Sequence, residues 1–191
     1  MITAYATPNP RWESWFAEYR YGAFYVFPPE PVLGRVNALR TLHDPRSQAI
    51  CAAHVSLTVP LPRPLTESAA REIATVVQRF APFEVQWGPP HRYPGVNGVV
   101  LSIAPMNHLR SLVHAIEACA AFADAPARRY PFSPHMTIAE FIDDARTEAL
   151  VQELIPQGLQ GTWWCDSVCY AVPDADFRFS IRRTWRCEGL A

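Results

Sequence analysis

Hydrophobic and polar residues alternate with a period of two along parts of this chain, and elsewhere apolar residues recur with the spacing of a helix. The alternating pattern predicts β-strands, because successive side chains of a strand point to opposite faces. Strands are expected over Gly22–Phe27, from near His54 to Pro60, over Phe83–Trp87, over Val99–Ala104 and from His135 onward. The stretches 162–172 and 177–185 also alternate, and they predict a hairpin across residues 173–176.

Apolar residues at positions i, i+3, i+4 and i+7 predict helices that bury one face against a sheet. A short helix is expected near Pro31–Leu42. Three further helical stripes are formed by Ile73, Val76, Val77 and Phe80, by Leu109, Leu112, Val113 and Ile116, and by Leu150, Val151, Leu154 and Ile155.

The two halves of the chain repeat one order of elements: strand, helix, strand with a histidine, helix, strand. His54 and His135 hold the same place in the two halves, 135 − 54 = 81 residues apart. Two copies are too few for a solenoid, so we expect a bilobal α+β fold built by pseudo-two-fold duplication. Two mainly antiparallel sheets should line a central cleft, with the helices outside. We expect residues 1–191 to form this single two-lobed domain, with about residues 1–20 as an extra N-terminal segment.

Each of these two histidines shares a strand face with hydroxyl residues. His54, Ser56 and Thr58 point to one side of the first strand, and His135 and Thr137 to one side of the second. The opposite faces are apolar, with Val55, Leu57 and Val59 in the first strand and Met136 and Ile138 in the second.

If the two polar faces meet across the cleft, two imidazoles and two hydroxyls surround one small volume. With a pKa of about 6.5, one imidazole can act as a general base and the other as a general acid near neutral pH. Hydroxyl groups can donate hydrogen bonds to the charged oxygens of a phosphate. The pattern therefore favours a phosphodiester site.

A single histidine followed two residues later by serine or threonine is close to a chance event, with about 0.6 matches expected for this composition. Two matches at the same place in an internal repeat are much harder to obtain by chance. The structural alternative is that a histidine at the start of a strand bonds a loop carbonyl and has no chemical role.

The overall charge excludes some classes of partner. The net charge is −1 and the isoelectric point is about 6.6, so the whole molecule does not attract polyanions, and we expect no duplex DNA partner. All 17 basic residues are arginine, which excludes a lysyl Schiff base and the lysine of a phosphate-binding P-loop. The N-terminus does not look like a signal peptide, and no stretch is apolar enough to span a membrane. We expect a cytoplasmic monomer that does not bind membranes.

The sequence gives little support for a metal site or for disulfide bonds. Five cysteines without a short secreted framework suggest reduced thiols in the core. Cys165 and Cys169 have the spacing of half a zinc site, but no second pair accompanies them. His43 and Asp44 resemble the dipeptide of metal-dependent phosphohydrolases, yet they stand before Pro45, where we expect a helix to end. We expect no metal and no cofactor.

The stretches HVSL at His54 and PFSPHMTIA around His135 resemble the paired motifs of the two-histidine (2H) phosphoesterase superfamily. The chain is similar to its 2'-5' RNA ligase and cyclic phosphodiesterase group from about Gly22 to Arg186. This resemblance implies metal-independent chemistry on 2',3'-cyclic or 2',5'-linked phosphodiesters. It implies catalytic roles for the two histidines and phosphate binding by Ser56 and Thr137.

One residue departs from the pattern of that group. RNA-processing members often carry a basic residue shortly after the second motif, where this chain has Glu140. A carboxylate does not help to bind RNA phosphate, which favours small nucleotides over polymeric RNA.

Four residues shortly before the second motif are candidates for substrate binding. Arg128 and Arg129 could hold phosphate, and Tyr130 and Phe132 could stack on a base. The alternative is a solvated arginine pair beside aromatic residues that pack a proline-rich loop.

Two hypotheses for function follow. The first is a metal-independent phosphodiesterase that acts on 2',3'-cyclic phosphate or 2',5'-linked nucleotide or RNA ends by acid/base catalysis with His54 and His135. The second is a non-catalytic nucleotide- or RNA-binding module that retains the cleft.

Overall fold

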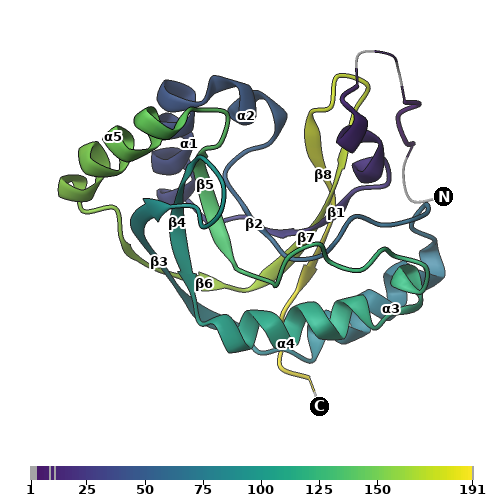
Figure 1. The fold of residues 1–191 in the computed structure, drawn as a ribbon. Helices are drawn as coiled ribbons and strands as arrows, with labels where there is room; N and C mark the ends of the chain where they lie inside the picture. Colours follow the sequence, from purple (N-terminus) through teal and green to yellow (C-terminus); the bar gives the residue numbers. More distant parts are fainter. Residues whose placement is uncertain (1–3, 9, 11, 191) are drawn as a thin grey trace.

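Two four-stranded antiparallel sheets form the centre of the molecule in the computed structural model, which describes residues 4–8, 10 and 12–190 (Figure 1). The first sheet has the order β2 (Val55–Ser56), β1 (Ala23–Val26), β7 (Ser167–Pro173), β8 (Phe179–Arg186). The second has the order β5 (His135–Ala139), β4 (Val99–Ala104), β3 (Phe83–Arg92), β6 (Gly161–Cys165). The predicted α+β fold with two antiparallel sheets is confirmed.

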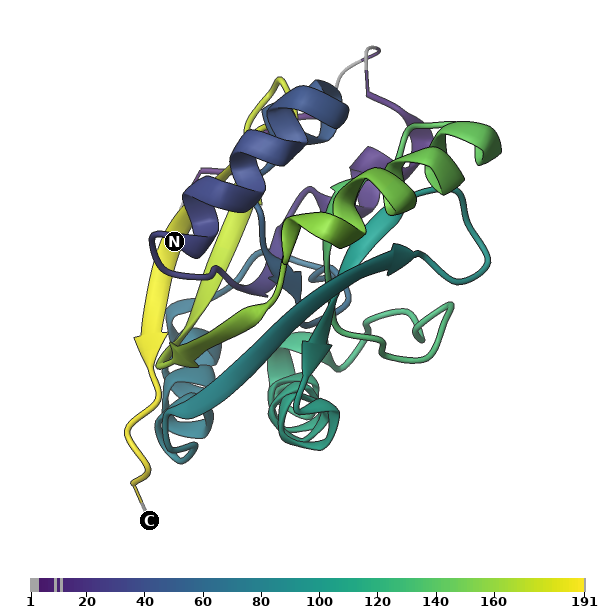
Figure 2. The same cartoon turned by 90° about the vertical axis from the view of Figure 1, so that its left-hand side faces the viewer.

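Helices pack around both sheets. The α-helices are α1 (Val32–His43), α2 (Pro45–Ile50), α3 (Glu67–Gln78), α4 (Met106–Glu117) and α5 (Asp144–Leu154), and the 3-10 helices are η1 (Ser14–Tyr19), η2 (Ala120–Phe122) and η3 (Ile155–Gln157). Figures 1 and 2 show α3 and α4 next to each other beneath the sheets. Helices α1 and α5 contact the second sheet.

Side-chain caps fix where several helices begin. The Thr66 hydroxyl accepts a hydrogen bond from the Ala69 backbone N–H at the start of α3. The Asp143 carboxylate does the same for Arg146 in α5. Such caps satisfy N–H groups that have no partner inside the helix. Helix α1 ends at His43, as expected from the sequence.

The two sheets match position by position, but each contains strands from both halves of the chain. Strand β3 belongs to the first half of the chain, but it pairs with β4 and β6 of the second half. In the same way β7 pairs with β1, so that Ala23 lies opposite Ala171. Strands β2, β1, β7 and β8 of the first sheet thus correspond to β5, β4, β3 and β6 of the second.

The C-terminal hairpin is only partly as predicted. Strands β7 and β8 form a hairpin, whereas residues 162–165 belong to β6 and pair with β3 in the other sheet. Asp166 separates the two pieces, which interrupts the strand where it passes from one sheet to the other. A register shift at Arg182 also changes the alternation of β8, so Ile181 is 49% exposed while Trp185 is buried.

The apolar faces of the motif strands lie in the core. Val55, Leu57, Met136 and Ile138 are each at most 1% exposed. The predicted stripe of α4 is also buried at all four positions. Thr58 departs from the expected pattern, because β2 ends at Ser56; its buried hydroxyl accepts a hydrogen bond from the Phe24 backbone N–H. In the described part of the chain, none of the helices has the length and apolarity needed to cross a bilayer.

Two leucines on helices provide a test of this core. Leu112 on α4 is fully buried, whereas Leu42 on α1 is 73% exposed. We expect Leu112→Ala to lower the free energy of unfolding by about 2–5 kcal/mol, because it leaves a cavity in the core. The matched change Leu42→Ala should cost less than about 0.5 kcal/mol in the same urea titration. Equal losses for the two variants would contradict the packing described.

Candidate active site

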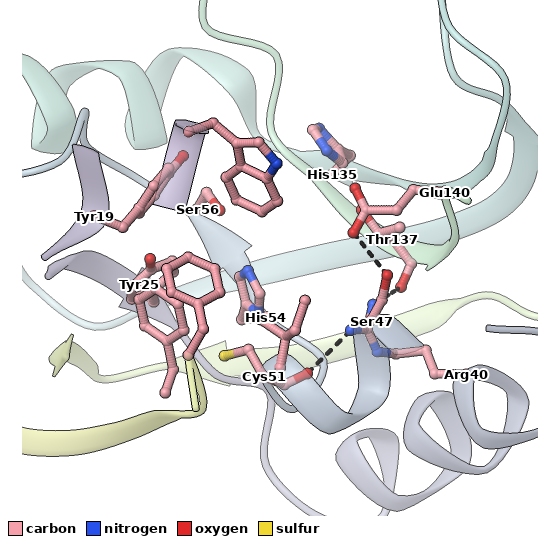
Figure 3. Close-up of a pocket in the computed structure, with 14 residues that line it drawn as sticks. Tyr19, Tyr25, Arg40, Ser47, Cys51, His54, Ser56, His135, Thr137 and Glu140 are labelled. Atoms are coloured by element: carbon pink, nitrogen blue, oxygen red, sulfur yellow. Dashed lines mark hydrogen bonds between the residues drawn. The ribbon is translucent and has the colours of Figure 1, made fainter. Parts of the chain in front are cut away.

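The strands that carry the two motifs meet at the edges of their sheets. Strand β2 ends the first sheet, β5 ends the second, and the two strands contact each other. His54 and Ser56 from one side and His135 and Thr137 from the other line a single cavity of about 180 Å³ (Figure 3). The structure therefore brings together the four residues that the paired motifs select.

Both histidines are oriented in the same way. The Nδ1 atom of His54 lies 2.7 Å from the Ala52 carbonyl oxygen, and Nδ1 of His135 lies 2.7 Å from the Ser133 carbonyl oxygen. A carbonyl oxygen can only accept a hydrogen bond, so Nδ1 carries the proton in each ring. In the neutral ring, Nε2 is then the unprotonated nitrogen and can accept a proton. The bond to a loop carbonyl, which the structural alternative invoked, thus fixes a tautomer suited to acid/base chemistry.

Aromatic rings flank both imidazoles. The Tyr25 ring meets His54 edge-on, with 4.8 Å between ring centroids, and the Tyr93 ring lies 4.4 Å from that of His135. These contacts exclude water from one side of each ring. They help to hold the ring orientation that the carbonyl bonds establish.

The environment keeps both histidines neutral near pH 7. Burial lowers the pKa of His54 from 6.5 to about 4, against the hydrogen bond to Ala52, which raises it. The charge of Arg40 also lowers the pKa of His54, as does that of His135 when its ring is protonated. Burial lowers the pKa of His135 as well, while the bond to Ser133 and the Glu140 carboxylate raise it. The Glu140 carboxylate therefore raises the pKa of His135, whereas the Arg40 guanidinium lowers the pKa of His54.

Arg40 of α1 joins the two motif segments. Its guanidinium donates hydrogen bonds to the Thr137 carbonyl oxygen at 2.7 Å and to the Cys51 carbonyl oxygen at 3.0 Å (Figure 3). Its Nε donates to the Gln48 side chain. The residue is only 3% exposed, and burial lowers the pKa of its side chain, against the nearby Glu140 carboxylate. No local pattern in the sequence sets Arg40 apart from the other arginines.

Glu140 lies at the edge of the cavity in a hydrogen-bond network. Its side chain contacts the Ser47 hydroxyl at 2.8 Å, and the same hydroxyl contacts the Asp44 carboxylate at 2.6 Å. Burial alone would raise the pKa of Asp44, but hydrogen bonds from Ser47 and from the Glu140 and Phe141 backbone hold it below 3.8. Asp44 thus accepts hydrogen bonds from Ser47 and from the Glu140 backbone N–H, which connects the start of α2 to the end of β5.

Aromatic residues form much of the remaining cavity wall, together with Ile50 and Cys51. The aromatic residues are Trp15 and Tyr19 from η1, Tyr25 from β1, Phe177 just before β8 and Phe179 at its start. Tyr19 and Trp15 belong to the N-terminal segment, to which the sequence analysis assigned no role. Trp15 and Tyr19 are far from both motifs in the sequence, so no local pattern indicates that they line the same cavity.

The four residues proposed for substrate binding from the sequence lie outside the set that lines this cavity. Arg128 donates hydrogen bonds to the Leu57 carbonyl oxygen and to Glu117, and its guanidinium lies 5.2 Å from the Phe132 ring centroid. Arg129 pairs with Glu18, and Tyr130 is 78% exposed. Arg128 therefore ties the loop before β5 to the first motif strand.

A second cavity of about 210 Å³ adjoins His135 on its other side. Its polar residues include His91 and Ser102, whose side chains lie 3.2 Å apart, and Tyr93. His91 belongs to no motif in the sequence. His135 thus borders two cavities, whereas His54 lines only the first of the two.

Metal-ligating residues do not gather in the described residues: no group of three or more His, Cys, Asp or Glu side chains is arranged to hold an ion there. All five cysteines are buried with free thiols. Burial raises the pKa of Cys165 to about 12, so its thiol is protonated near neutral pH.

Comparison with known proteins identifies the kind of fold and then the family. Escherichia coli LigT in complex with 3'-AMP superposes with a TM-score of 0.58 at 15% identity, over 86% of this chain and 96% of that chain. A protein of Thermus thermophilus gives 0.56 at 15% identity, over 88% and 98%. At such identities these matches establish a shared fold.

The family follows from the sequence itself. The model of the 2'-5' RNA ligase superfamily matches residues 28–176. A candidate phosphoesterase of Bacillus cytotoxicus is 27% identical over 122 residues, which cover 63% of this chain and 69% of that protein. The chain therefore belongs to the 2'-5' RNA ligase superfamily, and it is an enzyme of the 2H phosphoesterase class.

The position of Arg40 leads to a stability prediction. Arg40→Met keeps the aliphatic stem but leaves the Thr137 and Cys51 carbonyls unpaired. We expect the free energy of unfolding to fall by about 2–5 kcal/mol, because buried acceptors lose their donors. Turnover should fall about tenfold or more, because the motif segments lose their link.

Urea denaturation and a phosphodiesterase assay check both effects. Arg71→Met on the exposed face of α3 is the matched control and should change stability by less than about 0.5 kcal/mol. An Arg40→Met variant with wild-type stability and turnover would show that the hydrogen bonds from Arg40 to Thr137 and Cys51 are needed for neither property.

Proposed function

We propose that this enzyme hydrolyses 2',3'-cyclic phosphate or 2',5'-linked nucleotide ends by metal-independent acid/base catalysis. The observation that carries the proposal is the pair of histidines at the N-terminal ends of two adjoining edge strands, each with Nδ1 bonded to a carbonyl oxygen and each accompanied by a hydroxyl residue in the same cavity. The bound nucleotides of LigT, 3'-AMP in one structure and NADP+ in another, support a nucleotide ligand. A cytoplasmic, monomeric protein and activity on RNA ends remain predictions.

The two histidines take different roles in this mechanism. His54, whose pKa is lowered to about 4, is the neutral base that removes a proton from water. The water oxygen bonds to phosphorus, and the bond from phosphorus to a ribose oxygen breaks. His135, beside the Glu140 carboxylate, is the acid that protonates this departing oxygen. The negative phosphate favours the charged form of the nearby imidazole, so binding of the substrate promotes protonation of His135.

Hydroxyl groups and shape provide the rest of the catalysis. The Ser56 and Thr137 hydroxyls donate hydrogen bonds to the non-bridging phosphate oxygens, whose charge must be stabilised as water attacks. Placing the phosphate between the imidazoles makes proton transfer an event within one complex. Ligation is the same chemistry in reverse, with a 5'-hydroxyl in place of water.

Replacement of each histidine tests the mechanism. We expect His54→Ala and His135→Ala each to lower kcat by about 10² or more, since a positioned acid or base contributes about 10² to 10⁴. The assay uses a panel of 2',3'-cyclic nucleotides and 2',5'-linked dinucleotides in the presence of EDTA, where wild-type turnover should persist. His114→Ala on the exposed side of α4 is the control and should keep wild-type kcat.

Three results would contradict this mechanism. Near-normal kcat in either variant would make that histidine structural. Loss of wild-type turnover in EDTA with recovery on addition of a divalent ion would rule out metal-free chemistry. Nucleotide binding by the wild type without turnover of any substrate would favour the non-catalytic binding module.

The pH dependence tests the assignment of base and acid. The base must be neutral, which requires a pH above the pKa of about 4 for His54. The acid must be protonated, which requires a pH below that of His135, itself lowered from 6.5. We therefore expect kcat/KM, which reports the free enzyme, to be greatest between about pH 4 and 6.5 and to fall above that range.

The profile of kcat should lie at higher pH than that of kcat/KM, because the bound phosphate raises the pKa of both imidazoles. Initial rates across a pH series at several substrate concentrations give the two profiles. A maximum of kcat/KM above pH 7 would refute the assignment.

A further inference from the structure

Part of the cavity wall comes from outside the segment that matches the family. Trp15 and Tyr19 precede residue 28, and Phe177 and Phe179 follow residue 176, whereas both histidine motifs lie between these limits. The family segment thus supplies the polar part of the site. The two flanking segments of this chain supply an aromatic wall formed by Trp15, Tyr19, Phe177 and Phe179.

Aromatic packing holds the N-terminal part of this wall in place. The Phe16 ring stacks on the Phe177 ring, with 3.5 Å between centroids and an angle of 5° between planes. Phe177 has a φ of 62°, a conformation that is uncommon for an aromatic residue, and it is only 1% exposed. Trp15 meets this ring edge-on at 5.3 Å. The two flanking segments therefore pack as one unit.

Polar contacts connect this unit to the remainder of the site. Glu13 pairs with Arg46 of α2, and Glu18 pairs with Arg129 in the loop before β5. The Trp12 indole N–H donates a hydrogen bond to the Ala175 carbonyl oxygen at 2.9 Å. Residues 12–19 thus contact the turn between β7 and β8, α2 and the loop that leads to His135.

The charges in the cavity limit what it can bind. Among the residues that line it, Arg40 and Glu140 carry the formal charges. Each of the three guanidinium nitrogens of Arg40 already donates a hydrogen bond to the protein. Glu140 repels anions. The two imidazoles and two hydroxyls can hold one phosphodiester. Among the described residues that line the cavity, Arg40 is the one cation. It is only 3% exposed with a protein hydrogen bond at each nitrogen, so it is poorly placed to bind a second phosphate.

We propose that the aromatic wall is the subsite for a flat, uncharged ring of the substrate, and that the phosphodiester is the only charged group this substrate carries. Within the proposed function, on which this inference rests, the substrate is a nucleoside cyclic phosphate or an equivalent diester without a 5'-phosphate. The ring stacks or packs edge-on against Trp15 and its aromatic neighbours. The phosphate lies between the histidines.

The test compares three substrates: adenosine 2',3'-cyclic phosphate, ribose 2',3'-cyclic phosphate without a base, and the adenosine compound with an added 5'-phosphate. For the wild type we expect the lowest KM with the first. Loss of base stacking should raise KM about 5- to 150-fold. The 5'-phosphorylated compound should also show a raised KM, because it brings a second charge toward Glu140.

Variants separate binding of the ring from the chemistry. Trp15→Ala should raise KM for adenosine 2',3'-cyclic phosphate and leave kcat within a few-fold, while kinetics with the base-free compound should barely change. Trp15→Phe should restore most of the affinity. The matched control is Trp164→Ala on β6, where the indole is 66% exposed and lies outside the residues that line the cavity; it should behave as the wild type.

The outcomes distinguish this inference from the proposed function. Wild-type turnover with equal KM for the base-bearing and base-free compounds would overturn the subsite and leave the phosphodiesterase mechanism intact. So would a Trp15→Ala variant that loses activity equally on both compounds. If the wild type turns over none of the three compounds, the proposed function itself fails, and the subsite with it.

Discussion

The site depends on a buried guanidinium that bridges two strand edges. Strands β2 and β5 end different sheets, so the hydrogen-bond ladder of either sheet positions only its own histidine. Arg40 connects them, because it binds the backbone of Thr137 and the backbone of Cys51, three residues before His54. A buried charge with all of its nitrogens paired has a narrow range of acceptable positions. The relative placement of the two imidazoles therefore relies on a residue of neither motif.

The architecture is nearly symmetric, but the charges are not. Each histidine has the same bond to a carbonyl two residues earlier, and each has a tyrosine ring beside it, Tyr25 for His54 and Tyr93 for His135. Only His135 has its pKa raised by Glu140, and only His54 has its pKa lowered by Arg40. Pairs of titratable groups in different environments are the usual basis for separate acid and base roles. The duplicated fold thus supplies two equivalent imidazoles. Arg40 beside one and Glu140 beside the other make their electrostatic environments different.

Local patterns predicted the parts of this site that depend on local geometry. Strand alternation alone places Ser56 beside His54 and Thr137 beside His135, and it buries the residues between them. Arg40, Trp15 and Phe177 could not be found in this way, because their contacts join segments far apart in the sequence. The same reason explains the missed division of residues 162–172 between two sheets. Arg128 and Arg129 were predicted to bind phosphate because they lie near the second motif in the sequence. Arg128 instead donates hydrogen bonds to the Leu57 carbonyl oxygen and to Glu117.

The exchange of strands between the sheets has a consequence for synthesis of the chain. Strand β1 pairs with β7 across nearly the whole sequence, with Tyr25 opposite Cys169. A ribosome releases β1 and β2 long before β7 and β8, so the first sheet has an open edge until residues 167–186 emerge. Unpaired edges of this kind recruit other strands. The nascent protein cannot complete His54's side of the site until β7 and β8 have been translated.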